Sequence, residues 1–399
     1  MAIPCPFASP LPTPKATPLP SPLPQPATGG VIINEYRLRG PKGANDEFIE
    51  LYNSNNWPIV VTTTADGSPG WALAASDGLV RFIIPNGTVI PAHGHYLGVN
   101  ALGYSMNQYP SGSTQATINT QGDANYFLDI PDGAGLALFS IADPVLFSTA
   151  NRLDAVGYDT SPPLYREGAG FPAYGAERFA NLSYSFYRDL SGGSPKDTGN
   201  NLADFIGVDM NFYNTSAGQH LGAPGPQSLF SPLTPVSGAI QVAVLDPAVS
   251  STVAPNYVRN TTPDPANHNP FGTLLLRRKI INTSNANITT LRFRVVNITT
   301  FPAPDTSTAD IRLRNIWDDA FVTLTDGSTV PVHGTSGYYG DGYNAILYPS
   351  GVSPSKPLGP GQSIGVEFLL GFQQTGTWRF NILVEVLYNE KPETGTVDH

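Results

Sequence analysis

Glycine and proline interrupt this chain so often that long helices are excluded. The 399 residues include 40 glycines and 39 prolines, and both numbers are well above the usual share. Proline lacks a backbone donor and breaks a helix interior, whereas glycine favours turns. The runs between these breaks are short and rich in Val, Ile, Thr, Tyr and Phe, which favour strands. This pattern predicts an all-β chain.

Length and charge narrow the class further. A chain of 399 residues is long enough for two hydrophobic cores. Charged residues make up only 13% of it, about half of the usual share, and this composition favours an extracellular β protein. The formal net charge is −10. That balance disfavours nucleic acid as a partner, because affinity for phosphates depends on clustered Lys and Arg.

Neither a disulfide nor a membrane segment is expected. Cys5 is the single cysteine, so no intramolecular disulfide forms. The chain contains no apolar run of about 18 residues, the length that a transmembrane helix requires. Residues 1–10 also lack the basic and apolar regions of a signal peptide. The low cysteine content fits a bacterial exoprotein, and composition favours a place outside the cell or on its surface, although no export signal is visible in this sequence.

Composition divides the chain into five parts. Residues 1–30 repeat Leu-Pro, Ser-Pro and Thr-Pro pairs and predict an extended polyproline arm. This arm is either a spacer or an element that docks on a neighbouring subunit. We predict one β-sandwich over 31–225, a linker over 226–236, a second, immunoglobulin-like sandwich over 237–392 and a tail over 393–399. The prolines available for docking are Pro12, Pro14, Pro18, Pro20, Pro22 and Pro24.

Period-two and β-rich runs predict the individual strands. In the first domain they are 31–36, 48–53, 80–84, 96–99, 135–139, 154–158 and 184–188. In the second they are 239–244, 272–281, 290–296, 310–316, 321–325, 328–332, 363–371 and 377–387. Asp326-Gly327, between two of these runs, predicts a two-residue hairpin loop.

Several motifs of the first half resemble one family. Residues 31–53 (VIINEYRLRGPKGANDEFIELYN) hold an apolar strand that ends in Glu, followed by Asp-x-Phe-Ile-Glu-Leu-x-Asn. This pattern resembles the opening of a bacterial lamin tail domain. Further pieces follow in the order of that family at 90–100, 129–139, 153–159, 184–189 and 197–205. The resemblance implies an immunoglobulin-like sandwich and an interaction module, with no catalytic residues to carry over. The second half loosely resembles immunoglobulin-like domains of bacterial exoproteins.

The acidic residues of the first domain are the first candidates for chemistry. Glu35 and Glu50 lie on neighbouring predicted strands and form either a carboxylate pair for acid–base work or calcium, or a structural pair. In the structural interpretation they contact Arg or backbone groups at a sheet edge. Asp46, Glu47 and Glu50 are the best calcium candidates, although they lack the Asp-x-Asp-x-Asp-Gly spacing of a calcium loop. No cofactor is expected.

Histidine and arginine patterns give two further candidates. His93 and His95 are two residues apart on a predicted strand and would share a face, as a pair of zinc ligands or as a plain surface pair. Arginines alternate with apolar residues in two predicted strands, at Arg292, Arg294, Arg312 and Arg314. They predict ion pairs with Glu367 and Glu385 on an outer sheet face, or a patch for acidic glycans or a neighbouring subunit.

The function that these patterns favour is not catalytic. No Gly-x-Ser-x-Gly elbow is present, and no nucleophile, base and orienting group are arranged together. We expect a non-enzymatic extracellular structural protein, self-associating or surface-bound, such as a fibre subunit. Its partners would be copies of itself or other surface proteins. The alternative is a carbohydrate- or cell-wall-binding adhesion module that uses loop aromatics, namely Trp57, Trp71, Tyr104, Tyr109, Tyr338 and Tyr339.

Overall fold

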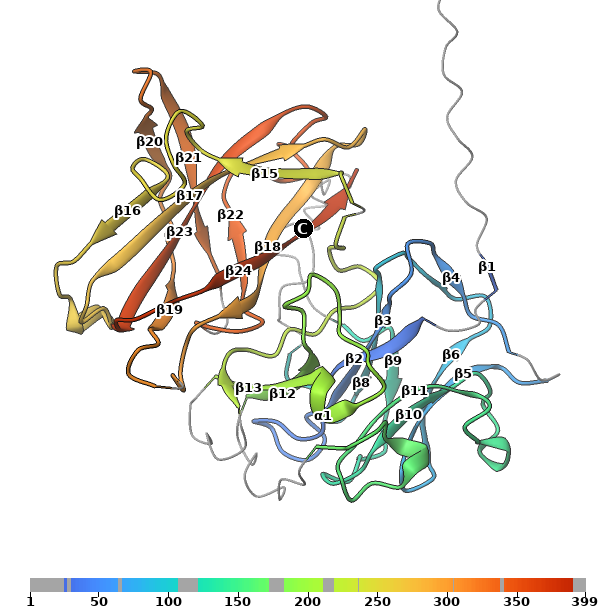
Figure 1. Cartoon of the computed structure of the whole chain (residues 1–399). Helices are drawn as coiled ribbons and strands as arrows, with labels where there is room; N and C mark the ends of the chain where they lie inside the picture. Colours follow the sequence, from blue (N-terminus) through green and yellow to red (C-terminus); the bar gives the residue numbers. More distant parts are fainter. Residues whose placement is uncertain are drawn as a thin grey trace, which may run out of the picture.

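The computed structural model shows an all-β chain, as the sequence predicts (Figure 1). It describes residues 25–26, 30–63, 67–106, 121–171, 183–210, 219–235, 237–303, 305–337 and 341–389. The α-helix in this part of the chain, α1 (Asn201–Asp204), is a single turn. None of the helices in these ranges is long and apolar enough to span a membrane.

The first domain is a sandwich of two sheets around one hydrophobic core. Its larger sheet has the order β14-β13-β12-β2-β3-β8-β9, and its smaller sheet has the order β11-β10-β5-β6. The short strands β1 (Gln25–Pro26), β4 (Ile59–Val60) and β7 (Val89–Ile90) pair separately. The large sheet comprises β2 (Val31–Arg37), β3 (Phe48–Asn53), β8 (His95–Asn100), β9 (Ala124–Tyr126), β12 (Tyr184–Arg188), β13 (Phe205–Asp209) and β14 (His220–Leu221). The small sheet comprises β5 (Gly70–Ala75), β6 (Val80–Pro85), β10 (Leu136–Phe139) and β11 (Arg152–Val156).

The second domain is also an immunoglobulin-like sandwich with its own core. Its two layers are continuous, because β21 pairs with β23 in one layer and with β22 in the other. One layer contains β15 (Ile240–Val244), β16 (Tyr257–Asn260), β17 (Thr273–Asn282), β19 (Asp310–Arg314), β20 (Ala320–Thr323), β21 (Thr329–Ser336) and β23 (Ser363–Gln374). The other contains β18 (Ile288–Ile298), β22 (Ile346–Pro349) and β24 (Phe380–Tyr388).

Close packing decides some local residue choices. Gly98 in β8 faces Phe82 of the opposite sheet, and a Cβ atom at this position would lie 2.1 Å from the Phe82 ring. The hairpin predicted at Asp326-Gly327 joins β20 to β21, but its loop is longer than two residues, since Leu324 and Ser328 form the closing backbone pair. Gly327 has a φ of 84°, a conformation that glycine adopts without strain.

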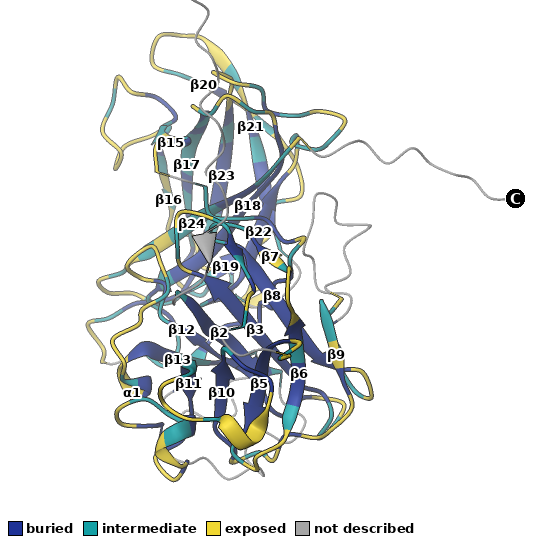
Figure 2. Cartoon of the chain, turned by 90° about the vertical axis from the view of Figure 1, so that its right-hand side faces the viewer, coloured by how far each residue is buried: buried dark blue, intermediate teal, exposed yellow. Residues whose placement is uncertain are grey.

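The two domains are stacked, and the contact covers strands that would otherwise face solvent (Figure 2). Every residue of β2, β3 and β8 is buried, and so is nearly all of β18. Since successive side chains point to opposite faces of a sheet, these strands are covered on both faces. One face packs in the core of its own sandwich, and the other packs against the neighbouring domain.

The segment that connects the domains lies inside this contact. Residues 221–228 are all buried, although their prolines and glycines prevent regular structure. Gly222 forms a bridge with Tyr343, and Leu233 forms one with Val386. The connection is therefore a layer of the interface, and the two sandwiches contact each other through it.

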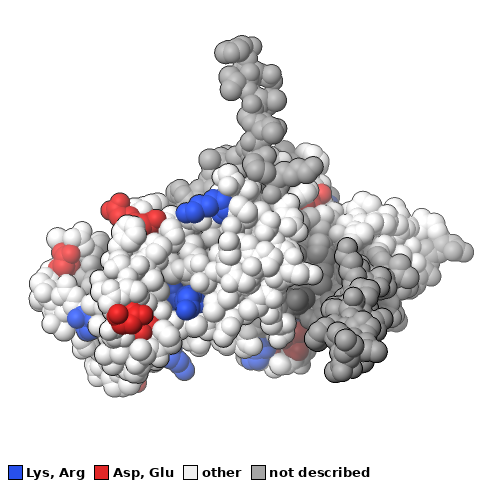
Figure 3. Space-filling model, turned by 90° about the horizontal axis from the view of Figure 1, so that it is seen from above, with Lys and Arg blue, Asp and Glu red and all other residues white. Residues whose placement is uncertain are grey.

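Charged groups are sparse on the molecular surface. Figure 3 shows isolated Lys, Arg, Asp and Glu side chains separated by uncharged surface on the face it displays. This agrees with the charged fraction of 13%.

Candidate functional site

The most distinctive site of the described chain is a buried polar network between the two domains. Glu35 of β2 and Glu50 of β3 stand directly opposite each other in the strand register. A β-bulge before Glu35 and the alternation of β3 turn both side chains away from the first core and toward the second domain. Both carboxyls are essentially inaccessible, at 1% and 0% exposure. We call the whole set the junction network: Glu35, Glu50, His95, Gly225, Gln227, Arg292, Arg294, Asn344 and Glu385.

Backbone amides of the connecting segment bind both carboxyls. The N–H of Gly225 donates to Glu35 Oε1 at 2.8 Å, and that of Gln227 donates to Glu50 Oε2 at 2.7 Å. Asn344, from the second domain, donates to Glu35 Oε2 at 3.2 Å. Each glutamate therefore compensates a donor that would be unsatisfied in a buried, irregular segment.

Two arginines of β18 complete the network from the other side. Arg292 and Arg294 both donate to Glu385 of β24, the latter through Nε at 2.8 Å. Arg292 also donates to the Gln227 side chain, and Arg294 to that of Asn344. These contacts join the second domain to the connecting segment.

Apolar contacts flank the network on two sides. On one side Phe48, Leu97 and Val99 of the first domain pack with Ile346 and Tyr348 of the second. On the other, Val296 of β18 packs with residues of the first domain, namely Tyr187, Leu190 and Val208. Such apolar surroundings exclude water and strengthen the electrostatic interactions within the junction network.

Burial shifts the protonation of the network strongly. It raises the pKa of Glu35 to about 7 and that of Glu50 to about 8, and it lowers the pKa of His95 to about 3. Glu385 is also desolvated, yet its pKa is lowered because Arg292 and Arg294 outweigh that effect. The Glu50 carboxyl is 2.8 Å from His95 Nδ1. A neutral Glu50 can donate to this neutral ring, so both groups are uncharged near neutral pH.

This geometry suits a structural role and not catalysis. Perturbed carboxyl groups are typical of active sites when a cleft exposes them. Here the carboxylate and guanidinium groups are sealed between two packed sheets, so a substrate has no access. The structural interpretation of Glu35 and Glu50 is therefore favoured, although the predicted place is wrong: β2 and β3 lie in the middle of their sheet and not at an edge.

The three calcium candidates do not form a common site. Asp46 pairs with Arg37, which is fully buried. Glu47 accepts from Asn100 at 2.8 Å, and burial raises its pKa to about 8. Glu50 belongs to the junction network. Each carboxyl thus has its own partners, because the three residues point in different directions from the start of β3.

The histidine pair is also placed differently from the prediction. His93 lies in the turn before β8 with a φ of 55°, and its ring contacts the Tyr52 hydroxyl at 2.9 Å and Asn56 at 2.8 Å. His95 is 4% exposed and contacts Glu50. The two residues do not form a surface pair, because the second domain covers His95.

The four arginines that the sequence suggested as one interaction patch lie in two different layers of the second sandwich. Arg292 and Arg294 are 0% and 1% exposed, so they cannot form a patch for glycans or another subunit. Their face is the one that the sequence predicts, but the first domain covers it. Arg312 pairs with Asp310, and Arg314 with Asp341, in the other layer of the sandwich. The predicted partner Glu367 pairs instead with Arg277.

The remaining candidates are either internal or outside the described residues. Trp71 is 1% exposed and donates to the Thr62 carbonyl, so it is a core residue. Trp57 is 40% exposed. Tyr104 packs against Phe48. Other candidates lie outside the described residues: Pro12, Pro14, Pro18, Pro20, Pro22, Pro24, Tyr109, Tyr338 and Tyr339.

Sequence reasoning did not identify a second charge cluster, in the first domain. Asp154, Glu167 and Asp197 bring carboxylate oxygens within 4.8 Å of one another. Arg188 donates to both oxygens of Asp154 at 2.9 Å, and Arg152 pairs with Glu167. Arginines supply the positive charge here, which makes the cluster an ion-pair network. The members of this cluster lie far apart along the chain, so no local sequence pattern indicates that they meet.

Comparison with known proteins finds a family that matches most of the first domain's length. Residues 24–158 match the family model of the Lamin Tail Domain. This match includes the opening motif, while the later pieces at 184–189 and 197–205 lie beyond it. No curated protein and no solved structure matches the chain. The lamin tail domain is a non-catalytic, immunoglobulin-like family. Within its first half, the chain is therefore similar to a lamin tail domain over residues 24–158.

Proposed function

We propose that this chain is a non-enzymatic extracellular structural protein of a bacterium, self-associating or surface-bound, whose two sandwiches work as one unit. The observation that carries the proposal is the junction network. Its carboxyl, guanidinium and backbone groups form hydrogen bonds with one another across the domain boundary, and breaking such a buried set is costly. A load or contact applied to one domain is thereby transmitted to the other.

The surface supports a role based on contacts. Sheet edges such as β9 and β15 offer backbone groups that another chain can pair with. The low charge reduces repulsion between copies at close packing. The proline-rich residues 1–24 would pack through their side chains, since proline cannot complete a hydrogen-bond ladder.

Deleting residues 1–23 tests the assembly part of this proposal. The deletion leaves β1 and the matched family segment in place, so both domains should keep their fold by circular dichroism. Electron microscopy and sedimentation should show filaments or oligomers for the full chain and monomers for the deletion. If the deletion variant still assembled, the proline-rich arm would be excluded as an assembly contact. A full chain that stays monomeric at high concentration would exclude self-association.

A second candidate, glycan binding, is favoured by a pocket at the domain boundary. Its volume is about 490 Å³, and aromatic rings, threonines and one arginine line it. Aromatic faces and hydroxyl groups are the chemistry that sugar rings require. The loop aromatics that suggested glycan binding from the sequence are not among the described residues that line this pocket.

A further inference from the structure

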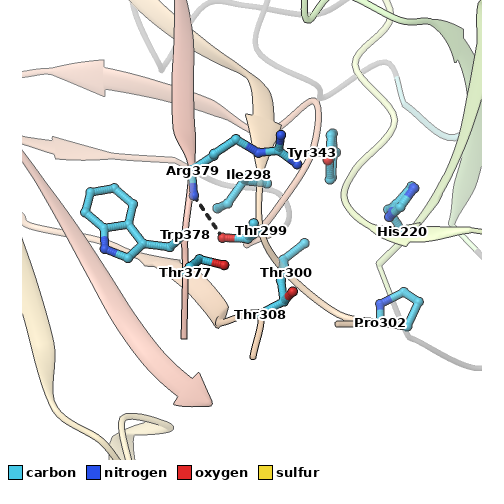
Figure 4. A pocket seen from close by; sticks show the side chains of 10 residues that line it. All are labelled: His220, Ile298, Thr299, Thr300, Pro302, Thr308, Tyr343, Thr377, Trp378 and Arg379. Carbon is cyan, nitrogen blue, oxygen red and sulfur yellow. Dashed lines mark hydrogen bonds between the residues drawn. The ribbon is translucent and has the colours of Figure 1, made fainter. Parts of the chain in front are cut away.

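The pocket that supports glycan binding has walls from both domains (Figure 4). His220 comes from β14 of the first domain, whereas Tyr343 precedes β22 and Arg379 precedes β24 of the second. Its volume of about 490 Å³ falls in the range of about 300–1,000 Å³ that small-molecule sites occupy. A folded chain with both domains docked is thus needed to form it.

Arg379 is the chemically exceptional residue of this pocket. Among the arginines of the described ranges, each of the others donates from its guanidinium to a carboxylate or a carbonyl oxygen. The hydrogen bonds of Arg379 among the described residues involve its backbone: its N–H donates to Thr299 Oγ1 at 3.1 Å, and its carbonyl accepts from the Thr299 N–H at 3.1 Å. The side chain is exposed, and no acidic residue is among those that line the pocket. With respect to the described residues, its charge is therefore available to an external anion.

The rest of the lining is uncharged. Burial lowers the pKa of His220, so this ring is neutral at neutral pH. Its centroid lies 4.9 Å from that of Tyr343, with 39° between the ring planes. Figure 4 shows the Arg379 side chain extending toward Tyr343, with His220 beyond it and Thr299, Thr300 and Thr308 below. An aromatic wall, a row of hydroxyls and one cation therefore surround the same space.

We propose that this pocket binds an acidic sugar, namely a uronate residue of a polysaccharide, with Arg379 holding its carboxylate. The proposal deepens the second candidate function and rests on it. A pyranose ring presents an apolar face to aromatic rings and hydroxyls to threonines, and a planar guanidinium matches a carboxylate with two donors. A neutral sugar would leave the cation unused. A phosphate ligand is less suited, because the pocket offers a single cation and an aromatic wall.

Titration calorimetry of the full chain with short uronate oligosaccharides tests the assignment. The panel contains galacturonate, glucuronate and mannuronate oligomers, each beside its methyl ester, which keeps the ring and removes the charge. Arg379→Gln removes the cation from an exposed position. Lys42→Gln is the matched control, because it removes one exposed positive charge in the first domain. His220→Ala removes part of the aromatic wall.

The expected result is binding of at least one free acid that Arg379→Gln weakens about tenfold or more, the loss expected for a charge-assisted contact. The methyl ester should bind the native chain as weakly as the free acid binds Arg379→Gln. Lys42→Gln should bind normally, and His220→Ala should weaken acid and ester alike.

Four results would overturn the assignment: no binding of any uronate, equal binding of acid and ester, an unaffected Arg379→Gln variant, or equal losses in both charge variants. Displacement by millimolar inorganic phosphate alone would identify a simple anion site instead. Assembly seen by electron microscopy should be the same for Arg379→Gln and the native chain. A failed pocket is thereby distinguished from a failed structural role.

Discussion

Glu50 is the residue on which the electrostatics of the junction depend most. It accepts from the Asn34 amide and from the Gln227 backbone, and its Oε1 lies 2.8 Å from His95 Nδ1. Its pKa is raised to about 8, well above that of an unfolded glutamate. The folded state therefore retains a proton that the unfolded state loses, and this contribution to stability disappears as pH rises toward 8. The pKa of His95 is lowered to about 3, and its effect on stability has the opposite sign. The unfolded state binds a proton at this histidine that the folded state does not, so stability falls as pH falls below the pKa of an unfolded histidine.

Replacing Glu50 by Gln should flatten the alkaline side of this profile. Between about pH 5 and pH 8 the native chain should lose on the order of several degrees in Tm. Glu50→Gln cannot ionise, so it should lose clearly less, while other buried carboxyls with raised pKa values, among them Glu35 at about 7 and Glu47 at about 8, account for the remainder. Differential scanning calorimetry at several pH values measures both profiles. Parallel profiles for the two proteins would show that Glu50 does not titrate in this range.

The contribution of an arginine ion pair to the free energy of unfolding depends on how deeply the pair is buried. Arg294→Gln leaves Glu385 with one guanidinium in a sealed site, and we expect a loss of about 3–5 kcal/mol in unfolding free energy. Arg314→Gln is the matched control, since its partner Asp341 is 49% exposed and such pairs contribute about 0–1 kcal/mol. Urea denaturation of both variants gives the comparison. Equal losses would contradict the role of the junction network.

At the scale of elements, most strands follow from local sequence. The runs predicted at 48–53, 184–188 and 363–371 match β3, β12 and most of β23. The prediction missed β5, whose sequence GWALAA is rich in small residues with weak strand preference. Tertiary packing makes it a strand, because neighbouring strands pair with it on both sides. Local sequence also did not predict that the connecting segment is buried, since its prolines and glycines indicate only an irregular linker.

A short Gly-Ser insertion tests the role of the connecting segment. Placed after Gly225, it should shift the amides that Glu35 and Glu50 accept from and lower stability markedly. Placed after Gly238, where the chain is exposed, it should be tolerated as most loop insertions are. Thermal denaturation measures both. A chain that tolerates the two insertions equally would show that the segment is a passive tether.

At the scale of the whole molecule, the two sandwiches have separate cores but a common interface. The cores comprise different residues, from β2–β13 and from β17–β24. Between them the junction network and its two apolar flanks form a continuous buried layer. An interface of this kind couples the unfolding of one domain to that of the other.

Calorimetry of the full chain should therefore show one cooperative unfolding transition. Glu385→Gln removes the carboxylate that Arg292 and Arg294 share, which leaves two buried cations poorly compensated. We expect this variant to unfold in two transitions, because each core then melts without the other. Two transitions already in the native chain would show that the interface is too weak to couple the domains.

The sequence by itself determined the all-β class, most strands and the lamin tail motifs, because each depends on neighbouring residues and on the two-residue period of a strand. It also predicted which face of β18 carries Arg292 and Arg294. Only the tertiary structure decided what covers that face. A period-two pattern reports the direction of a side chain, whereas its environment depends on segments far along the chain. Glu35 lies 309 positions before its partner Asn344, and no local pattern relates two residues at that distance.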